Sequence, residues 1–176
     1  MTLQASTSQL TFKLGGNTKN FEWHQDNGFG HLSPYNAISC LLAMDQVTTE
    51  NGCLHIIPES HTKHGQIEVS MSAEDKSNQK EIVLEPDDSN AIPVTMNAGD
   101  VLLFHCHTLH RSMGNFTPHP RRILFCRYSD ADSVEVYNDG RPRLGRVVRG
   151  TSQFEEVRNF ERELDEKCTG GLIRMK

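Results

Sequence analysis

A His-x-Asp pair lies near the start of the chain, within the sequence Trp-His-Gln-Asp at residues 23–26. Side chains of an extended strand alternate between its two faces, so His24 and Asp26 point the same way while Gln25 points the opposite way. One strand can therefore supply two ligands to one metal ion. If a second histidine joins them from elsewhere, two histidines and one carboxylate leave positions of an octahedral metal open, as in non-haem Fe(II) oxygenases. Open positions favour catalysis, because structural metal sites are closed.

A histidine-rich segment much later in the chain offers the second histidine. His105, His107 and His110 lie within six residues, and the spacing alone does not choose among them. His105 and His107 would share one face of a strand, so a separate zinc or copper site with Cys106 is an alternative. Histidine and cysteine on core strands are more often packed and hydrogen-bonded than ligating, so we prefer a packed role for these two histidines.

Length and charge limit the functional classes. The chain has 176 residues and a formal net charge of −5. This length can bury the core of one globular domain, and no second domain is marked, so we predict a single domain over residues 1–176. Nucleic-acid recognition needs a net basic face, which an acidic chain does not favour. We therefore expect a small-molecule substrate and no nucleic acid.

The cysteines and the hydropathy pattern bear on the compartment. The chain has five cysteines with no C-x-x-C motif, and an odd, unpaired set favours reduced thiols in an intracellular protein. The N-terminus lacks the cationic start and apolar run of a signal peptide, and no segment approaches about 18 continuous apolar residues. We expect a soluble, cytoplasmic protein without a membrane partner.

Short apolar or alternating runs separated by turns predict a mainly β fold, a sandwich or barrel. A long polar excursion over residues 61–90 contains one weaker strand at 81–84. We expect the first two strands to pair as a hairpin, and the next two to flank a turn at Asn51-Gly52. The predicted strands cover residues 9–14, 20–26, 35–44, 53–57, 92–96, 101–107 and 123–128.

One helix is predicted near the C-terminus, over residues 151–167. Ser152 and Glu155 have the spacing of a capping box, and apolar residues recur at helical intervals behind them. Gly170-Gly171 would end the helix.

An ordered series of motifs resembles the phytanoyl-CoA dioxygenase family. The motifs extend over nearly all of residues 23–122, and their order is hard to obtain by chance. They are W-H-Q-D-N-G-F-G at 23–30, A-M-D at 43–45, E-N-G-C-L at 50–54, I-P-E-S-H at 57–61, G-D-V-L-L-F-H at 99–105, L-H-R-S at 109–112 and N-F-T-P-H-P-R-R at 115–122.

The resemblance implies a double-stranded β-helix, that is, a cupin-like jelly-roll core over about residues 8–129, followed by a C-terminal loop and helix over 130–176. It implies Fe(II), 2-oxoglutarate and O2 as cofactor and cosubstrates. It makes His110, in L-H-R-S, the third metal ligand beside His24 and Asp26. The predicted metal and catalytic residues are therefore His24, Asp26 and His110.

The resemblance also assigns the cosubstrate contacts. A dicarboxylate that chelates iron at its keto acid end leaves a distal carboxylate, which the rigid fork of an arginine can bind. Arg121 takes this role by resemblance, with Ser112 as a nearby hydroxyl donor. Arg122 would point to the opposite face of a regular strand. We include Gln25 among the cofactor-binding candidates, although bonding to a neighbouring strand is an open alternative.

The implied activity is oxidative decarboxylation of 2-oxoglutarate to succinate and CO2, coupled to hydroxylation of a small molecule. Two alternatives stay open: a cupin-like metal protein that does not use 2-oxoglutarate, and a shortened non-catalytic core that binds a partner. An arginine at position 121 argues against the first. The sequence does not identify the substrate.

Two further features carry expectations. Family members usually have a partly helical region before this core, so a core that starts near Gln9 should leave an N-terminal sheet edge uncovered and open to self-association. Four arginines over residues 141–149 could bind a phosphate-bearing substrate such as an acyl-CoA. We prefer a solvated loop, because such clusters are common on surfaces.

Overall fold

The computed structural model describes residues 2–26, 32–34, 36–65, 67, 84–136 and 138–169. The chain divides into two compact units. We call the first the core unit, which comprises Gln9–Phe29 and Ile38–Phe125. The second is the terminal unit, which comprises Met1–Ser8, Gly30–Ala37 and Cys126–Lys176. The prediction of a single domain stays a prediction.

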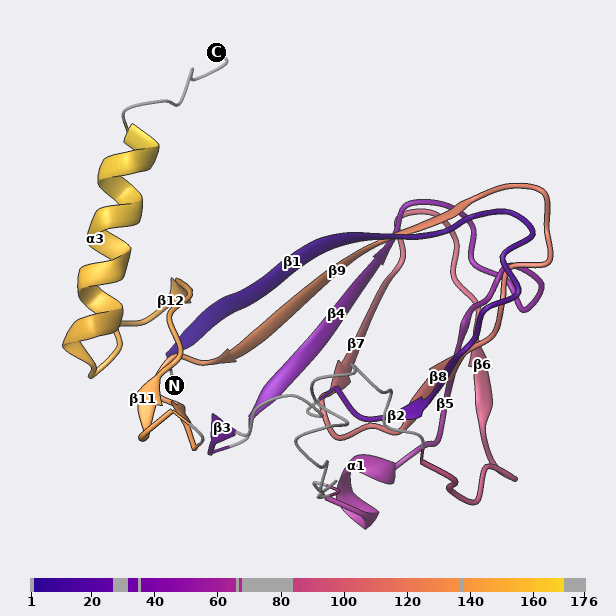
Figure 1. Cartoon of the computed structure of the whole chain (residues 1–176), viewed down its shortest axis with the longest axis horizontal. Helices are drawn as coiled ribbons and strands as arrows, with labels where there is room; N and C mark the ends of the chain where they lie inside the picture. Colours follow the sequence, from indigo (N-terminus) through magenta and orange to yellow (C-terminus); the bar gives the residue numbers. More distant parts are fainter. Residues whose placement is uncertain are drawn as a thin grey trace. The chain divides into compact units, whose positions relative to one another are not determined.

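The described strands form antiparallel sheets, as the mainly β prediction requires (Figure 1). A five-stranded sheet has the order β12-β1-β9-β4-β7, a four-stranded sheet has the order β2-β8-β5-β6, and a small sheet has the order β11-β10-β3. The strands of the five-stranded sheet are β12 (Arg146–Arg149), β1 (Leu3–Lys13), β9 (Arg121–Asp130), β4 (Ala37–Ala43) and β7 (Val101–His105). Those of the four-stranded sheet are β2 (Phe21–His24), β8 (His110–Ser112), β5 (Leu54–Ile56) and β6 (Ile92–Val94). Those of the small sheet are β11 (Arg141–Pro142), β10 (Val134–Glu135) and β3 (Leu32–Ser33).

The main core of the core unit gathers on one face of the five-stranded sheet. Along β4, buried Ser39, Leu41 and Ala43 alternate with more exposed neighbours, as expected for a strand with one buried face. Leu54 of β5 and Val94 of β6 pack against the same cluster, which therefore joins the two larger sheets. The buried members are Leu41, Ala43, Val47, Cys53, Met96, Phe104 and Ile123.

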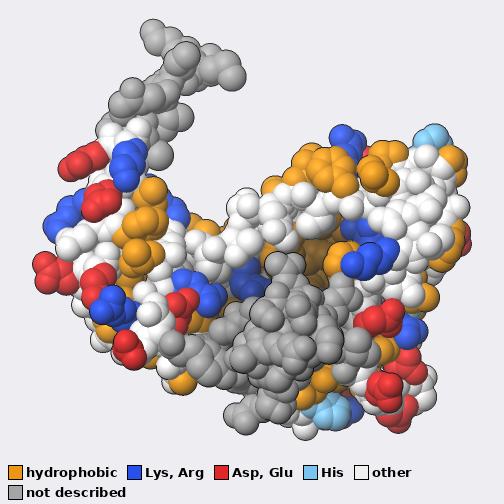
Figure 2. Space-filling view, in the orientation of Figure 1, with side chains coloured by type: hydrophobic (Ala, Val, Ile, Leu, Met, Phe, Trp, Pro, Cys, Tyr) orange, Lys and Arg blue, Asp and Glu red, His pale blue; other side chains and the backbone are white. Residues whose placement is uncertain are grey.

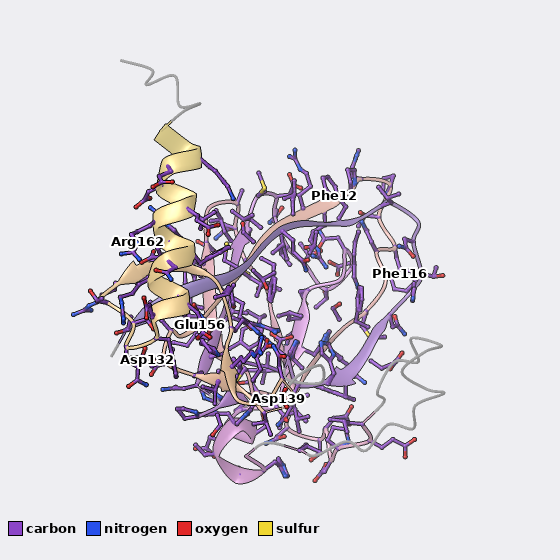
Figure 3. The ribbon with its side chains drawn as sticks, turned by 60° about the vertical axis from the view of Figure 1, so that its left-hand side comes forward. Phe12, Phe116, Asp132, Asp139, Glu156 and Arg162 are labelled. Carbon is purple, nitrogen blue, oxygen red and sulfur yellow. The ribbon has the colours of Figure 1, made fainter. Side chains whose placement is uncertain are left out.

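The opposite face of the five-stranded sheet is apolar and exposed. Its side chains alternate with the buried ones, and Leu103 reaches 63 % exposure. Figure 2 shows hydrophobic side chains at the surface near the end of β1, and Figure 3 labels Phe12 on that strand. We call this surface the apolar sheet face; its exposed members are Leu10, Phe12, Ile38, Val101 and Leu103.

The predicted strands are found at or close to their expected positions, but the predicted hairpin is wrong. Strand β1 is hydrogen-bonded to β12 and β9, whereas β2 pairs with β8 in the other sheet. Strands β4 and β5 flank the predicted turn at Asn51-Gly52, as expected, and they lie in different sheets. The chain crosses between the sheets at these connections, so neighbours in sequence are not neighbours in a sheet.

Strand β12 covers the first residues of β1, with Leu3 opposite Arg149 and Ala5 opposite Arg146. This pairing ends before Gln9, so the predicted open edge near Gln9 stays a prediction. Leu10 and Phe12 are nevertheless exposed, as expected, because they belong to the apolar sheet face.

The C-terminal helix α3 (Glu155–Thr169) begins four residues later than predicted. The Ser152 hydroxyl donates to Asp132 at 2.7 Å and accepts from the amide of Phe154, so Ser152 closes a turn before the helix. A short helix, α1 (Ser60–Lys63), was not predicted. The helix stop at Gly170-Gly171 and most of the predicted strand 81–84 lie outside the described residues, and Leu84 itself is not in a strand.

Two of the four clustered arginines are engaged in ion pairs within the terminal unit. Arg143 contacts Glu135 and Arg146 contacts Asp165, each at 2.6 Å. These pairs favour the surface interpretation over a phosphate site. In the described part of the chain, no helix is long and apolar enough to cross a membrane.

Candidate functional site

Three predicted ligands converge in the core unit. Strand β2 pairs with β8 in a register that places His24 opposite His110, and Asp26 follows β2 by two residues. Oδ1 of Asp26 lies 3.9 Å from Nε2 of His24 and 3.5 Å from Nε2 of His110. One ligand atom from each residue lies within 4.8 Å of the others, a spacing that can hold one metal ion. Within the described residues, this is the one group of its kind.

Both imidazoles are held by their second nitrogen. Nδ1 of His24 lies 2.6 Å from the carbonyl oxygen of Glu22, and Nδ1 of His110 lies 2.8 Å from that of Thr108. A carbonyl can only accept a hydrogen bond, so each Nδ1 must carry the proton. Each Nε2 then has a free lone pair on the side of Asp26. A histidine that binds a metal through Nε2 needs this tautomer.

Asp26 is fixed from both sides. Its amide donates to the carbonyl of Cys106 at 3.0 Å, and the hydroxyl of Ser39 on β4 donates to its Oδ2. The second carboxylate oxygen, Oδ1, is the one that faces the two histidines. Asp26 can therefore act as a monodentate ligand whose other oxygen is held by a neighbouring strand.

Gln25 points away from the ligands, as strand alternation predicts. Its amide nitrogen donates to the carbonyls of Gly65 at 2.7 Å and His107 at 2.8 Å, and its amide oxygen accepts from the Ile67 amide at 3.0 Å. All the hydrogen-bonding positions of this buried amide are used by the backbone except one oxygen lone pair. This geometry favours the open alternative, bonding to a neighbouring segment, over a cosubstrate contact.

Arg121 is buried on the inner side of β9, and Arg122 is exposed, as alternation predicts. Nη2 of Arg121 donates to the Gly52 carbonyl at 2.7 Å, and its Nε is buried without a hydrogen-bond partner among the described residues. Burial lowers the pKa of this guanidinium. Arg122 instead forms an exposed fork to Asp45 at 2.7 and 2.9 Å.

A second buried cation, Lys13 at the end of β1, was not predicted. Its Nζ donates to the carbonyl of Ser112 at 3.2 Å and to that of Met113. Burial, and then the charge of Arg121, lower its pKa to about 8. In the described part of the chain, neither cation is paired with a carboxylate, so the two buried side chains form an electropositive cluster. We call it the basic pocket.

Ser112 links the ligands to the basic pocket. It lies on β8 two residues after His110, so both side chains project from the same face about 7 Å apart along the strand. Ser112 is buried, and its carbonyl accepts from Lys13. A ligand that bridges the metal ligands and the basic pocket would therefore pass beside the Ser112 side chain.

The alternative metal site at His105 and His107 is not assembled. The His107 amide donates to Nδ1 of His105 at 3.1 Å, and burial lowers the pKa of both imidazoles. His105 lies edge-on to His107 and faces His61 of α1 at 5.7 Å between ring centroids. These contacts fit the packed role.

Two contributors to the site were missed in the sequence, Lys13 and Ser39. Both occupy inward positions of their strands. Lys13 shares its strand face with Thr11, whereas the apolar Leu10 and Phe12 lie on the other face, so the alternation predicts an exposed lysine and gives no sign of its burial. A single serine on an apolar strand carries no signal either.

Comparison with known proteins agrees with this geometry. Residues 4–123 match the model of the phytanoyl-CoA dioxygenase (PhyH) family. An ectoine dioxygenase from Stutzerimonas stutzeri (strain A1501) is 31 % identical over 148 residues, which cover 75 % of this chain and 49 % of that protein. The chain thus spans about half the length of this curated relative.

Solved structures share the fold. A non-heme monooxygenase, ThoJ, superposes with a TM-score of 0.69 at 20 % identity, covering 96 % of this chain and 65 % of that chain. EvdO2 from Micromonospora carbonacea var. aurantiaca, complexed with 2-oxoglutarate, gives a TM-score of 0.63 at 24 % identity, covering 80 % of this chain and 56 % of that chain. These similarities confirm the predicted jelly-roll fold class.

Gly52 is predicted to be irreplaceable beside the basic pocket. Its φ is +85°, and a Cβ there would lie 2.5 Å from the Met113 carbonyl oxygen and 3.0 Å from Cδ of Lys13. Backbone strain alone costs about 1–3 kcal/mol. Gly52→Ala should therefore lower the free energy of unfolding by more than this amount. Gly99→Ala is the matched control, because Gly99 has φ +95° and open space around its Cβ. Urea denaturation measures both; equal losses would show that the close approach costs nothing.

Proposed function

The chain belongs to the phytanoyl-CoA dioxygenase family, and we propose that it is the jelly-roll core of an Fe(II)- and 2-oxoglutarate-dependent oxygenase that hydroxylates a small molecule. The observation that carries the proposal is the cluster of His24, Asp26 and His110, which Ser112 connects to the basic pocket: Ser112 follows His110 by two residues on β8, and its carbonyl accepts from the buried Lys13. The metal ligands suit the keto acid end of 2-oxoglutarate, and the pocket suits its distal carboxylate.

The donor set fits Fe(II). Two neutral imidazoles and one carboxylate are the donors of non-haem iron oxygenases, and held second nitrogens are typical of metal-binding histidines. Bound iron would supply the activation of O2 that drives decarboxylation of 2-oxoglutarate to succinate and CO2. His24, Asp26 and His110 would hold the metal through Nε2, Oδ1 and Nε2.

The chain's own residues position the cosubstrate. Arg121 and Lys13 together would offer two positive charges for one distal carboxylate, and Nε of Arg121 has no hydrogen-bond partner among the described residues. Ser112 would donate a hydroxyl hydrogen bond, since it lies on the same face of β8 as His110. Phe104 packs in an edge-to-face arrangement against the His110 ring, with 4.9 Å between the ring centroids.

The basic pocket argues against the cupin-like alternative. A metal protein that does not use 2-oxoglutarate has no need for two buried cations, which are costly to bury without a counter-charge. The second alternative, a shortened non-catalytic core, differs from an oxygenase in that it would show no turnover. The direct test is to add 2-oxoglutarate to the Fe(II) protein without oxygen, and then to measure succinate release after air is admitted. Metal binding without succinate release on any small-molecule substrate would support the non-catalytic core.

Substrate, assembly and compartment remain proposals. The relatives are named as dioxygenases or hydroxylases of different small molecules, such as an ectoine dioxygenase and a methylphosphonate hydroxylase. We propose a small-molecule substrate without assigning one. We propose a cytoplasmic location, because the unpaired spacing of the five cysteines favours reduced thiols.

The first functional prediction concerns the third ligand. His110→Ala should abolish Fe(II) binding, because it removes one of three ligands, whereas His107→Ala should retain it. Isothermal titration of the metal into both variants measures the difference. The opposite ranking would move the site to the other histidine.

The second prediction concerns Arg121. Arg121→Leu should weaken 2-oxoglutarate binding roughly ten- to a hundredfold, since a charged hydrogen-bond pair contributes about 1.5–3 kcal/mol. Fe(II) affinity should stay nearly unchanged, because no ligand is lost. Arg122→Leu is the matched control, since Arg122 is exposed and paired with Asp45. A larger effect of Arg122→Leu would contradict the assignment.

The third prediction uses the pKa of Lys13. Because this pKa is about 8 in the ligand-free protein, Lys13 is charged below that pH and neutral above it. The affinity for 2-oxoglutarate should therefore fall as the pH rises above 8, by up to about tenfold per pH unit. Binding titrations on either side of pH 8 measure this slope. In Lys13→Met the slope should disappear; an unchanged slope would remove Lys13 from the cosubstrate site.

The fourth prediction concerns self-association. We propose that two copies of the chain associate through the apolar sheet face, because burial of exposed apolar side chains is favourable. Light scattering should show a concentration-dependent mass above that of one chain. Leu103→Ser should lower this mass, whereas Leu144→Ser should not, because Leu144 is a similarly exposed leucine of the terminal unit. A monomer at all concentrations would refute the proposal.

A further inference from the structure

We infer that Trp23, Arg111 and Asp88 form a positioning clamp on the outer face of the two ligand strands, which couples metal affinity to the docking of segment 84–91. The inference rests on the proposed metal site. Trp23 precedes His24 on β2, and Arg111 follows His110 on β8. Strand alternation therefore places both clamp residues on the face opposite the ligands.

The three side chains form a closed set of contacts. The guanidinium carbon of Arg111 lies 4.7 Å from the centre of the Trp23 ring, a cation–π contact. The Trp23 indole nitrogen donates to Oδ2 of Asp88 at 3.2 Å, and Nη1 of Arg111 lies 3.2 Å from the same oxygen. One carboxylate oxygen thus bridges residues from both ligand strands.

The clamp acts where the backbone ladder is irregular. The pairing of β2 with β8 consists of Phe21 opposite Ser112 and His24 opposite His110, and the register shifts between these two pairs. A shift of one residue at His24 would turn its imidazole to the outer face. The contact between Trp23 and Arg111 stabilises the observed register one residue away from the ligands.

Asp88 brings a third segment into this arrangement. The Leu84 amide donates to the Trp23 carbonyl at 3.2 Å, and the Ala91 amide donates to the Asp88 carbonyl at 2.9 Å. Leu84 and Ala91 also pack against the buried cluster of Trp23, Ile57 and Leu109. Segment 84–91 is therefore attached to the backbone that precedes His24. If docking of this segment favours the metal-binding register, metal binding must favour its docking to the same extent.

The test compares metal binding and amide exchange in matched variants. Asp88→Ala removes both contacts of the bridging oxygen, and Asp88→Asn retains an acceptor for Trp23 while losing the charge that faces Arg111. Asp87→Asn is the control, because Asp87 is exposed and the hydrogen bonds of its carboxylate that the described residues show go to Ser89, two residues away. The probe is Ni(II), titrated into each purified full chain, with hydrogen exchange of the Leu84 amide measured before and after loading.

We expect Asp88→Ala to lower Ni(II) affinity about tenfold, the low end for residues that support metal ligands, with a smaller loss in Asp88→Asn and none in Asp87→Asn. Ni(II) should slow exchange at Leu84 in the wild-type chain and have little effect on it in Asp88→Ala. A purely structural role would lower stability without changing this metal-dependent protection.

The outcomes separate the two proposals. If the wild-type chain binds Ni(II) and the Asp88 variants match it in affinity and protection, the clamp is refuted while the metal site stands. If the wild-type chain binds no metal, the proposed function fails and the clamp fails with it. Should Asp88→Ala not fold, Asp88→Asn decides the question by the same two measurements.

Discussion

The register that places His24 opposite His110 is the constraint on which the rest of the site depends. Strand side chains alternate with a period of two, so one pairing decides which residues face inward on both strands. The observed pairing turns both imidazoles toward Asp26 and turns Trp23 and Arg111 to the opposite face. The same alternation directs Gln25 toward backbone groups behind the ligands. The candidate metal ligands and the proposed clamp residues thus lie on opposite faces of the same strands.

The basic pocket also depends on strand pairing. Lys13 lies at the end of β1 and Arg121 at the start of β9, two strands that are hydrogen-bonded neighbours in the five-stranded sheet. Placing two cations together inside a protein costs free energy, and the lowered pKa of Lys13 is one expression of that cost. An anionic ligand would remove the cost by supplying the missing charge. Without such a ligand, the carbonyl oxygens of Gly52 and Ser112 accept hydrogen bonds from Arg121 and Lys13 but do not neutralise their charges.

Local patterns in the sequence located most of the longer strands, because alternation of polar and apolar residues indicates an extended strand. They did not identify strand partners. The predicted hairpin of residues 9–14 with 20–26 is wrong because partner choice depends on contacts far apart in sequence, and β2 pairs with β8 instead. Short strands such as β3, β10 and β11 contain two residues each, too few to show any period. The helix start was misplaced because Ser152 bonds to the distant Asp132.

In the candidate site, too, the residues of one local motif could be predicted from the sequence, whereas a ligand from a distant segment could not be chosen by its spacing. His24 and Asp26 belong to one short motif whose geometry follows from a strand alone, so the residues themselves identify them as a ligand pair. His110 could be chosen over His107 only through the family resemblance, since both lie in one short segment. The structure supports that choice, because Nε2 of His110 lies 3.5 Å from Oδ1 of Asp26, and the possible metal-binding group found among the described residues includes His110 but not His107. The Thr108 carbonyl holds Nδ1 of His110 and so favours the tautomer whose Nε2 can bind a metal. Both conditions depend on pairing between strands that are far apart in sequence, which is why the spacing of the histidines could not supply them.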